Sequence, residues 1–357
     1  MTSEIPQPSS RRSGEIEIRL ILTLVACVSL LTFCNSVCLA QGLAPLGRLE
    51  SKTGNITSAA FLSDGKTVLA GSYQEVLVAP LDDLSQHKSW TGFKGYVSQL
   101  AISPDGNLCA CGQYQKITLV SVVDGSIQEQ LAHHRGQITG LKFLDQDHLV
   151  SVADDGTVAR WTRDADSNTW KVTEKKTFDD PVNGLTVDLT GKNLLVAIGD
   201  ETRVTRPGKT VCLNLETLEE KWETELHRSA TTCLAVTSDG KSVLSGSFDE
   251  TIIRSSLATG EAENIFRGHV RTVNCMVVHP SLPYVVSGSG GRNKGKNELL
   301  VWNLETGAIP VRLESHQGKI TCVALTADGK TLASGGADKV LLIYNLEQFL
   351  SSLKPVE

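Results

Sequence analysis

The chain has 357 residues, 40% hydrophobic and 21% charged, so it holds enough apolar material for a sizeable core. Its formal net charge of −6 argues against bulk electrostatic binding to nucleic acid. Only 5% of residues are aromatic, while valine, leucine, glycine, serine and threonine dominate. That composition suits many short strands.

The first forty residues have the pattern of a secretory signal peptide. Three arginines precede an uninterrupted apolar run at residues 20–33, and Cys38 and Ala40 place small residues before a cleavage site. Cleavage there would leave a chain that starts at Gln41 and is exported, to the periplasm or the cell exterior. Alternatively, residues 20–40 form an uncleaved membrane anchor, because this uncharged stretch is almost long enough to span a bilayer.

Residues 41–357 are predicted to form a single repetitive domain. Residues 48–71 and 312–335 align without a gap and share more than half of their amino acids. The mean period is about 44 residues, and each unit reads as four short strands of alternating apolar residues, a pattern typical of β-propeller blades. The seven units lie near residues 54–94, 95–135, 136–179, 180–228, 229–269, 270–317 and 318–350.

The fold prediction is therefore an all-β, seven-bladed propeller of four-stranded antiparallel blades. The seventh unit stops after its third strand, near Leu346. Residues 43–53 resemble the fourth strand of the sixth unit, so we expect this N-terminal strand to complete the last blade. Closure of this kind would protect every blade, because a blade buries its faces only against its neighbours.

Several polar and aromatic residues recur at matching positions of the units. They are His134, Ser151, Asp155, Trp161, His227, Asp249, His269, Trp302, His316 and Asp338. This pattern resembles the WD-repeat (G-beta-like) family, and the leader would make the chain an exported, bacterial-type member. In that family His, Ser or Thr, Asp and Trp form a buried hydrogen-bonded network. The resemblance therefore implies a structural role for these ten residues.

The same histidines and aspartates could be taken for a metal cluster or for general bases. However, they recur once per unit and so should lie around a ring rather than converge. No catalytic residue, metal or cofactor is therefore predicted. His133 and His279 depart from the repeat, and we expect them at the surface.

The cysteines outside the leader leave the redox compartment open. Cys233, Cys275 and Cys322 occupy the same position in successive units and should point the same way, which does not suit disulfide geometry. Cys109 and Cys111 are two positions apart on one strand, also a poor pair. We expect buried free thiols, although an exported chain could oxidise them.

Two units carry long insertions between their second and third strands, at residues 200–209 and 290–297. Such loops all emerge on one face of a propeller, so their cations would share that face and are candidates for partner binding. These candidates are Arg203, Arg206, Lys209, Arg292, Lys294 and Lys296. The alternative is two solvated hairpin tips.

The predicted function is a non-enzymatic scaffold that binds another protein, and not nucleic acid, through one propeller face. An alternative is a cofactor-binding or enzymatic propeller, either of the pyrroloquinoline-quinone type or a hydrolase. Residues 213–222 resemble one copy of the quinone-type motif, although Leu218 stands where that motif has glycine. A third possibility is a sensor or assembly domain anchored by the uncleaved leader.

Overall fold

The computed structural model describes residues 44–203, 205–291 and 297–352. The chain divides into two compact units, Met1–Gly42 and Leu43–Glu357, and the described residues all belong to the second. The predicted leader therefore lies outside the described residues. The second unit is built almost wholly from strands, which confirms the predicted all-β class. Its short helices are η1 (Leu84–Gln86) and α2 (Leu346–Ser352).

All sheets are antiparallel, and within the described residues five have four strands and one has seven. The first two four-stranded sheets consist of β2 (Ser58–Phe61), β3 (Thr67–Gly71), β4 (Tyr73–Pro80) and β5 (Lys88–Tyr96), and of β13 (Val182–Val187), β14 (Asn193–Ile198), β15 (Gly208–Asn214) and β16 (Glu220–His227). Two more consist of β17 (Thr231–Val236), β18 (Ser242–Ser247), β19 (Thr251–Ser256) and β20 (Ala262–Arg267), and of β21 (Val273–Val278), β22 (Tyr284–Ser289), β23 (Leu299–Asn303) and β24 (Val311–Leu313). The fifth contains β1 (Gly47–Glu50), β25 (Ile320–Leu325), β26 (Thr331–Gly336) and β27 (Val340–Asn345).

The seven-stranded sheet differs from the separate second and third units that the repeat predicts. Its strands are β6 (Gln99–Ile102), β7 (Leu108–Gly112), β8 (Tyr114–Ser121), β9 (Ile127–Phe143), β10 (His148–Ala153), β11 (Thr157–Arg163) and β12 (Trp170–Thr177). Strand β9 joins the two units because it pairs with β8 through its first half and with β10 through its second. The chain stays extended through His134 and Gly136, so no break separates the two halves.

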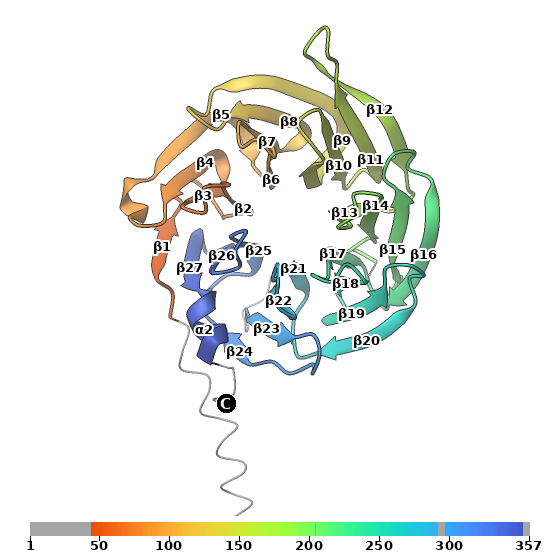
Figure 1. The fold of residues 1–357 in the computed structure, drawn as a ribbon. Coiled ribbons are helices and arrows are strands. Elements are labelled where there is room, and N and C mark those ends of the chain that lie inside the picture. The colour runs from red at the N-terminus through yellow and green to blue at the C-terminus, as the bar shows by residue number, and fades with distance from the viewer. Residues whose placement is uncertain (1–43, 204, 292–296, 353–357) are drawn as a thin grey trace, which may run out of the picture. The chain divides into compact units, whose positions relative to one another are not determined.

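The sheets of this unit are arranged around a ring, with β2, β6, β13, β17, β21 and β25 toward the centre and β1 at the outer edge (Figure 1). Neighbouring inner strands contact one another in the order β2, β6, β9, β13, β17, β21 and β25, and β25 returns to β2. Side chains fill the spaces between sheets: Val150 and Val152 of β10 pack with Leu194 and Val196 of β14. Each sheet thus buries its faces against its neighbours, as expected for a repeat architecture.

Strand β1 takes the place expected of a fourth strand beside β27. The two pair antiparallel, with Leu49 opposite Leu341. Leu49 is 3% exposed and packs with Ile56, Leu77 and Leu341, which come from both ends of the chain. The N-terminal strand therefore contributes to the core between the first and last sheets.

A cycle of side-chain hydrogen bonds links the inner strands. In each link a Ser, Thr or Asn side chain donates a hydrogen bond to a backbone carbonyl of the next repeat around the ring. Ser98 Oγ, for example, donates to the Ile138 carbonyl over 2.6 Å. The last link runs from Thr321 to the carbonyl of Ile56 and so closes the cycle. The seven donors among the described residues are Thr57, Ser98, Thr139, Asn183, Thr232, Asn274 and Thr321.

The turns between first and second strands follow one plan. Asp64 accepts the backbone N–H groups of Lys66 and Thr67, and Gly65 supplies the positive φ of 63° that the turn requires. His279 fills the aspartate's role in the sixth unit, since its Nδ1 accepts the N–H groups of Ser281 and Leu282. The expectation that His279 lies at the surface is therefore wrong: the side chain is buried because it caps this turn.

Among the described residues, no helix has the length and apolarity needed to cross a membrane.

Candidate functional site

The third unit contains the complete predicted network. Trp161 Nε1 donates to Ser151 Oγ over 2.8 Å, and His134 Nε2 lies 2.7 Å from the same oxygen. The other ring nitrogen of His134 lies 3.6 Å from Asp155, which also accepts the backbone N–H groups of Arg135 and Thr157. The network holds the middle of β9, at His134 and Arg135, against the turn between β10 and β11. Its geometry is that of a structural brace.

Two further units share the histidine and aspartate of this brace but lack its tryptophan. His227 Nδ1 lies 3.2 Å from Asp249, and its Nε2 lies 2.8 Å from the hydroxyl of Ser245. His316 repeats the arrangement: its Nδ1 lies 3.1 Å from Asp338, and its Nε2 lies 2.7 Å from a serine hydroxyl. The predicted residues of each unit are therefore close together, but the units are spread around the ring.

In the sixth unit a glutamate replaces the aspartate. His269 Nε2 and Trp302 Nε1 each lie 2.7 Å from Ser287 Oγ, as in the third unit. The acid is Glu298, whose fully buried carboxylate lies 3.9 Å from His269 and forms an ion pair with Arg312. The inserted loop moves the acidic residue past the turn, so matching the repeat by position missed it.

The first unit has no histidine and uses a different buried acid. Glu75 is 9% exposed, and its carboxylate accepts hydroxyl hydrogen bonds from Ser51 over 3.1 Å, Thr53 over 2.7 Å and Ser89 over 3.0 Å. Ser51 also lies 2.8 Å from the hydroxyl of Ser72. Residues just after β1 are thus held to the β3–β4 turn without the family's histidine.

Burial and hydrogen bonding set the protonation of these networks. Burial raises the pKa of Asp249, but the hydrogen bonds from His227 and Thr251 outweigh it and hold that pKa well below its usual range. Burial lowers the pKa of His134 and His269, although the neighbouring acids oppose the shift. These two imidazoles are therefore neutral at pH 7, as hydrogen-bonded structural side chains.

The three described cations predicted to bind a partner already have acidic neighbours. Arg203 lies 3.2 Å from Asp200, and Arg206 lies 2.7 Å from Asp180. Lys209 lies 2.6 Å from one glutamate and 3.4 Å from a second, on β16. Arg203 remains 62% exposed, and Lys209 27% exposed. Arg292, Lys294 and Lys296 lie outside the described residues.

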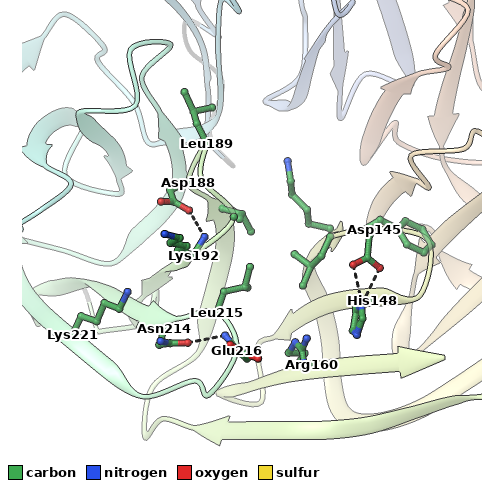
Figure 2. Close-up of a pocket in the computed structure, with 15 residues that line it drawn as sticks. Asp145, His148, Arg160, Asp188, Leu189, Lys192, Asn214, Leu215, Glu216 and Lys221 are labelled. Carbon is green, nitrogen blue, oxygen red and sulfur yellow. Dashed lines mark hydrogen bonds and ion pairs between the residues drawn. The ribbon is translucent and has the colours of Figure 1, made fainter. Parts of the chain in front are cut away.

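A hollow opens where strands β9 and β10 meet the next sheet. Its volume is about 630 Å³, within the usual range for ligand pockets. Figure 2 shows Asp145 and His148 on one wall, Asp188, Leu189 and Lys192 on the other, and Arg160 and Leu215 between them. Antiparallel topology places this hollow at the opposite end of the strands from the loop that holds Arg203. No motif in the sequence predicts this hollow, because its lining residues come from separate parts of the chain.

Three segments match the family model of the WD domain, G-beta repeat: residues 219–253, 260–294 and 308–345. The chain contains WD repeats. These matches fall in the C-terminal half and contain the predicted residues His227, His269 and His316.

Segments of the chain are also similar to curated relatives. The chain is 36% identical over 83 residues to "Small ribosomal subunit protein RACK1y" of Oryza sativa, covering 23% of each protein. It is 29% identical over 84 residues to "Periodic tryptophan protein 2" of Saccharomyces cerevisiae, covering 24% of this chain and 9% of that one. It is 26% identical over 132 residues to "p21-activated protein kinase-interacting protein 1-like" of Danio rerio, covering 36% and 34%. The chain thus spans at most about a third of these relatives.

The cysteines of the WD repeats sit beside the inner hydrogen-bond cycle. Cys233, Cys275 and Cys322 each pair with a glycine of the second strand, so they occupy equivalent positions as predicted. Burial raises the pKa of Cys233 and of Cys322 to about 12. Such thiols are poor nucleophiles at neutral pH because almost none is ionised.

Proposed function

We propose that this chain is a non-enzymatic protein-interaction scaffold built on a seven-bladed WD-repeat propeller. The cycle of inner hydrogen bonds supports the blade number, because its seven links pass through every sheet and return from Thr321 to Ile56. The pairing of β1 with β27 supports closure of the last blade by the N-terminal strand.

The observation that carries the scaffold function is the repeated bracing of loops at one end of the strands. The brace around Ser151 and its counterpart around Ser287 hold the segments between sheets to neighbouring turns. A surface ordered before binding loses little conformational entropy on association. WD-repeat proteins generally bind other proteins, and the zebrafish relative is named for its interaction with a kinase.

The proposed docking surface on this face includes the cations of the two inserted loops. Arg203 and Arg206 support the idea because they remain partly exposed beside their ion pairs. An acidic partner would then compete with Asp200 and Asp180 for these side chains. Its affinity should fall steeply with salt, since exposed charges are screened at physiological ionic strength.

We also propose that the scaffold is exported or anchored to a membrane, and the support is the apolar run at residues 20–33 with its flanking pattern. N-terminal sequencing of the protein from its native cells would decide between cleavage after Ala40 and an uncleaved anchor. A start at Gln41 is the expected result, and an intact leader would favour the anchor.

Chemical crosslinking in native cells, followed by identification of the attached protein, tests the scaffold proposal. The affinity of the captured partner is then measured for the unaltered protein and for a variant in which all six candidate cations are replaced by serine. The six are Arg203, Arg206, Lys209, Arg292, Lys294 and Lys296. Unchanged affinity and salt dependence would exclude this face, provided that the variant keeps its melting temperature. If no protein is crosslinked reproducibly, the scaffold proposal itself is wrong.

A further inference from the structure

The hollow between the third and fourth units is lined by more cationic side chains than by carboxylates free to pair with them. Four cationic side chains line it: Lys142, Arg160, Lys192 and Lys221. It also has three carboxylates, of which Asp145 lies 2.8 Å from His148 and Asp188 accepts four hydrogen bonds within its own turn. The third, Glu216, lies at the exposed edge.

Three of the cations have no acidic partner of their own. Across the described parts of the chain, no carboxylate lies within ion-pair distance of Lys142, Arg160 or Lys192. Arg160 Nε is buried and has no hydrogen-bond partner. Lys142 is exposed at the edge of the hollow, and desolvation by the protein around it lowers the pKa of its ammonium. A bound anion would relieve both costs.

Apolar side chains lie beside these charges. Leu189 is 66% exposed at the rim, and Phe143, Leu144, Val187 and Leu215 complete the lining. An exposed leucine next to unpaired cations favours a ligand with both a carboxylate and an apolar group. A polyphosphate fits less well, because Asp188 and Glu216 share the hollow and would repel dense negative charge.

We propose that this hollow binds an acidic peptide segment of a protein partner. Carboxylates of the segment face Lys142, Arg160 and Lys192, and a neighbouring apolar side chain packs on Leu189. The inference rests on the proposed scaffold function and adds a second docking surface, at the opposite end of the strands from Arg203.

An NMR titration of the ¹⁵N-labelled protein tests the proposal without the native partner. The probe is a capped Gly-Ser peptide with a central Glu-Leu-Glu, and the same peptide with Gln-Leu-Gln is its control. We expect saturable shifts of the backbone amides of Gly191, Lys192 and Glu216 with the acidic peptide, and none with the neutral one. If the acidic peptide leaves these amides unchanged, the proposal is wrong.

Matched protein variants show whether the unpaired cations are responsible. Lys142→Gln with Lys192→Gln should weaken peptide binding about tenfold, which corresponds to ~1.4 kcal/mol. The control pair, Lys171→Gln with Lys330→Gln, removes the same charge from exposed lysines that pair with Asp164 and Glu347 elsewhere. Equal affinity of both double variants would overturn the proposal, once melting temperatures show that each is folded.

Two outcomes separate this proposal from its alternatives. If inorganic phosphate or a short oligodeoxynucleotide shifts the same amides at lower concentration than the peptide, the ligand is a phosphate compound and the peptide assignment fails. If a crosslinked native partner binds the Lys142→Gln, Lys192→Gln variant unchanged and the peptide does not bind, the hollow is excluded while the scaffold function stands.

Discussion

Replacement of Leu49 by alanine tests whether the N-terminal strand is a working part of the ring. Leu49 is the buried residue of β1, and its neighbours Arg48 and Glu50 point to solvent. Its side chain lies among Ile56, Leu77 and other residues of the first and last sheets. The substitution leaves the backbone pairing with β27 available and removes only the apolar contact.

The expected loss follows from burial. Leucine burial contributes about 1.5–3 kcal/mol by transfer from water. The cavity left behind brings the cost of Leu→Ala to about 2–5 kcal/mol. For a domain of this size we expect the melting temperature to fall by about 3–8 °C. Leu131→Ala is the matched control, because Leu131 is also 3% exposed and lies on the outer part of β9.

Thermal and urea unfolding, followed by circular dichroism, measure both variants. Similar losses would show that β1 is held as firmly as a strand in the interior of the chain. If Leu131→Ala costs several kcal/mol while Leu49→Ala costs less than ~0.5 kcal/mol, the size of a typical surface substitution, β1 is not docked and the closure argument fails.

Three more predictions concern the braces, one strained turn and acid stability. Ser151→Ala should reduce the free energy of unfolding by about 2–4 kcal/mol, since it removes two hydrogen bonds and leaves a buried indole N–H unpaired. Urea unfolding measures this loss, and a loss under ~0.5 kcal/mol would contradict the prediction. Leu218→Gly should lower the free energy of unfolding by about 1–3 kcal/mol. Glycine would relieve the backbone strain of the positive φ of 55° at Leu218, but the buried leucine side chain contributes more to stability than that strain costs. A rise in melting temperature would show the reverse. Acidification below pH 6.5 should lower the free energy of unfolding. Burial depresses the folded-state pKa of His134 and His269, so the unfolded chain binds more protons than the folded chain in this range. A melting temperature that stays constant from pH 7 to pH 5 would refute this.

The strand pattern was predictable because it depends on local alternation and turn chemistry. Asp64 and Gly65 show this: an acceptor side chain followed by a residue free to adopt positive φ specifies the turn whatever surrounds it. The continuity of β9 was not predictable in this way. Whether a chain breaks between two sheets depends on how those sheets pack, and no local motif near Gly136 signals it.

The networks were predictable where spacing is regular and hidden where it is not. Ser151 and its partners follow the repeat, whereas Glu298 reaches His269 from beyond an inserted loop. The inner hydrogen-bond cycle did have a signal, a β-branched residue followed by Ser, Thr or Asn, as in Ile320-Thr321. The hollow had none, because Lys142 and Lys192 are far apart in sequence and only the packing of two units brings them together.

The pairing of β1 with β27 also has a consequence for biosynthesis. Leu49 leaves the ribosome about 290 residues before its partner Leu341, and at roughly 5–20 residues per second this interval lasts on the order of 15–60 s. During that time the strand lacks β27, its hydrogen-bonding partner. Arg48 and Glu50 flank the apolar residue, and charges of this kind discourage an unpaired strand from joining a foreign edge. The charged residues of β1 thus protect the strand from unwanted pairing until β27 has been synthesised.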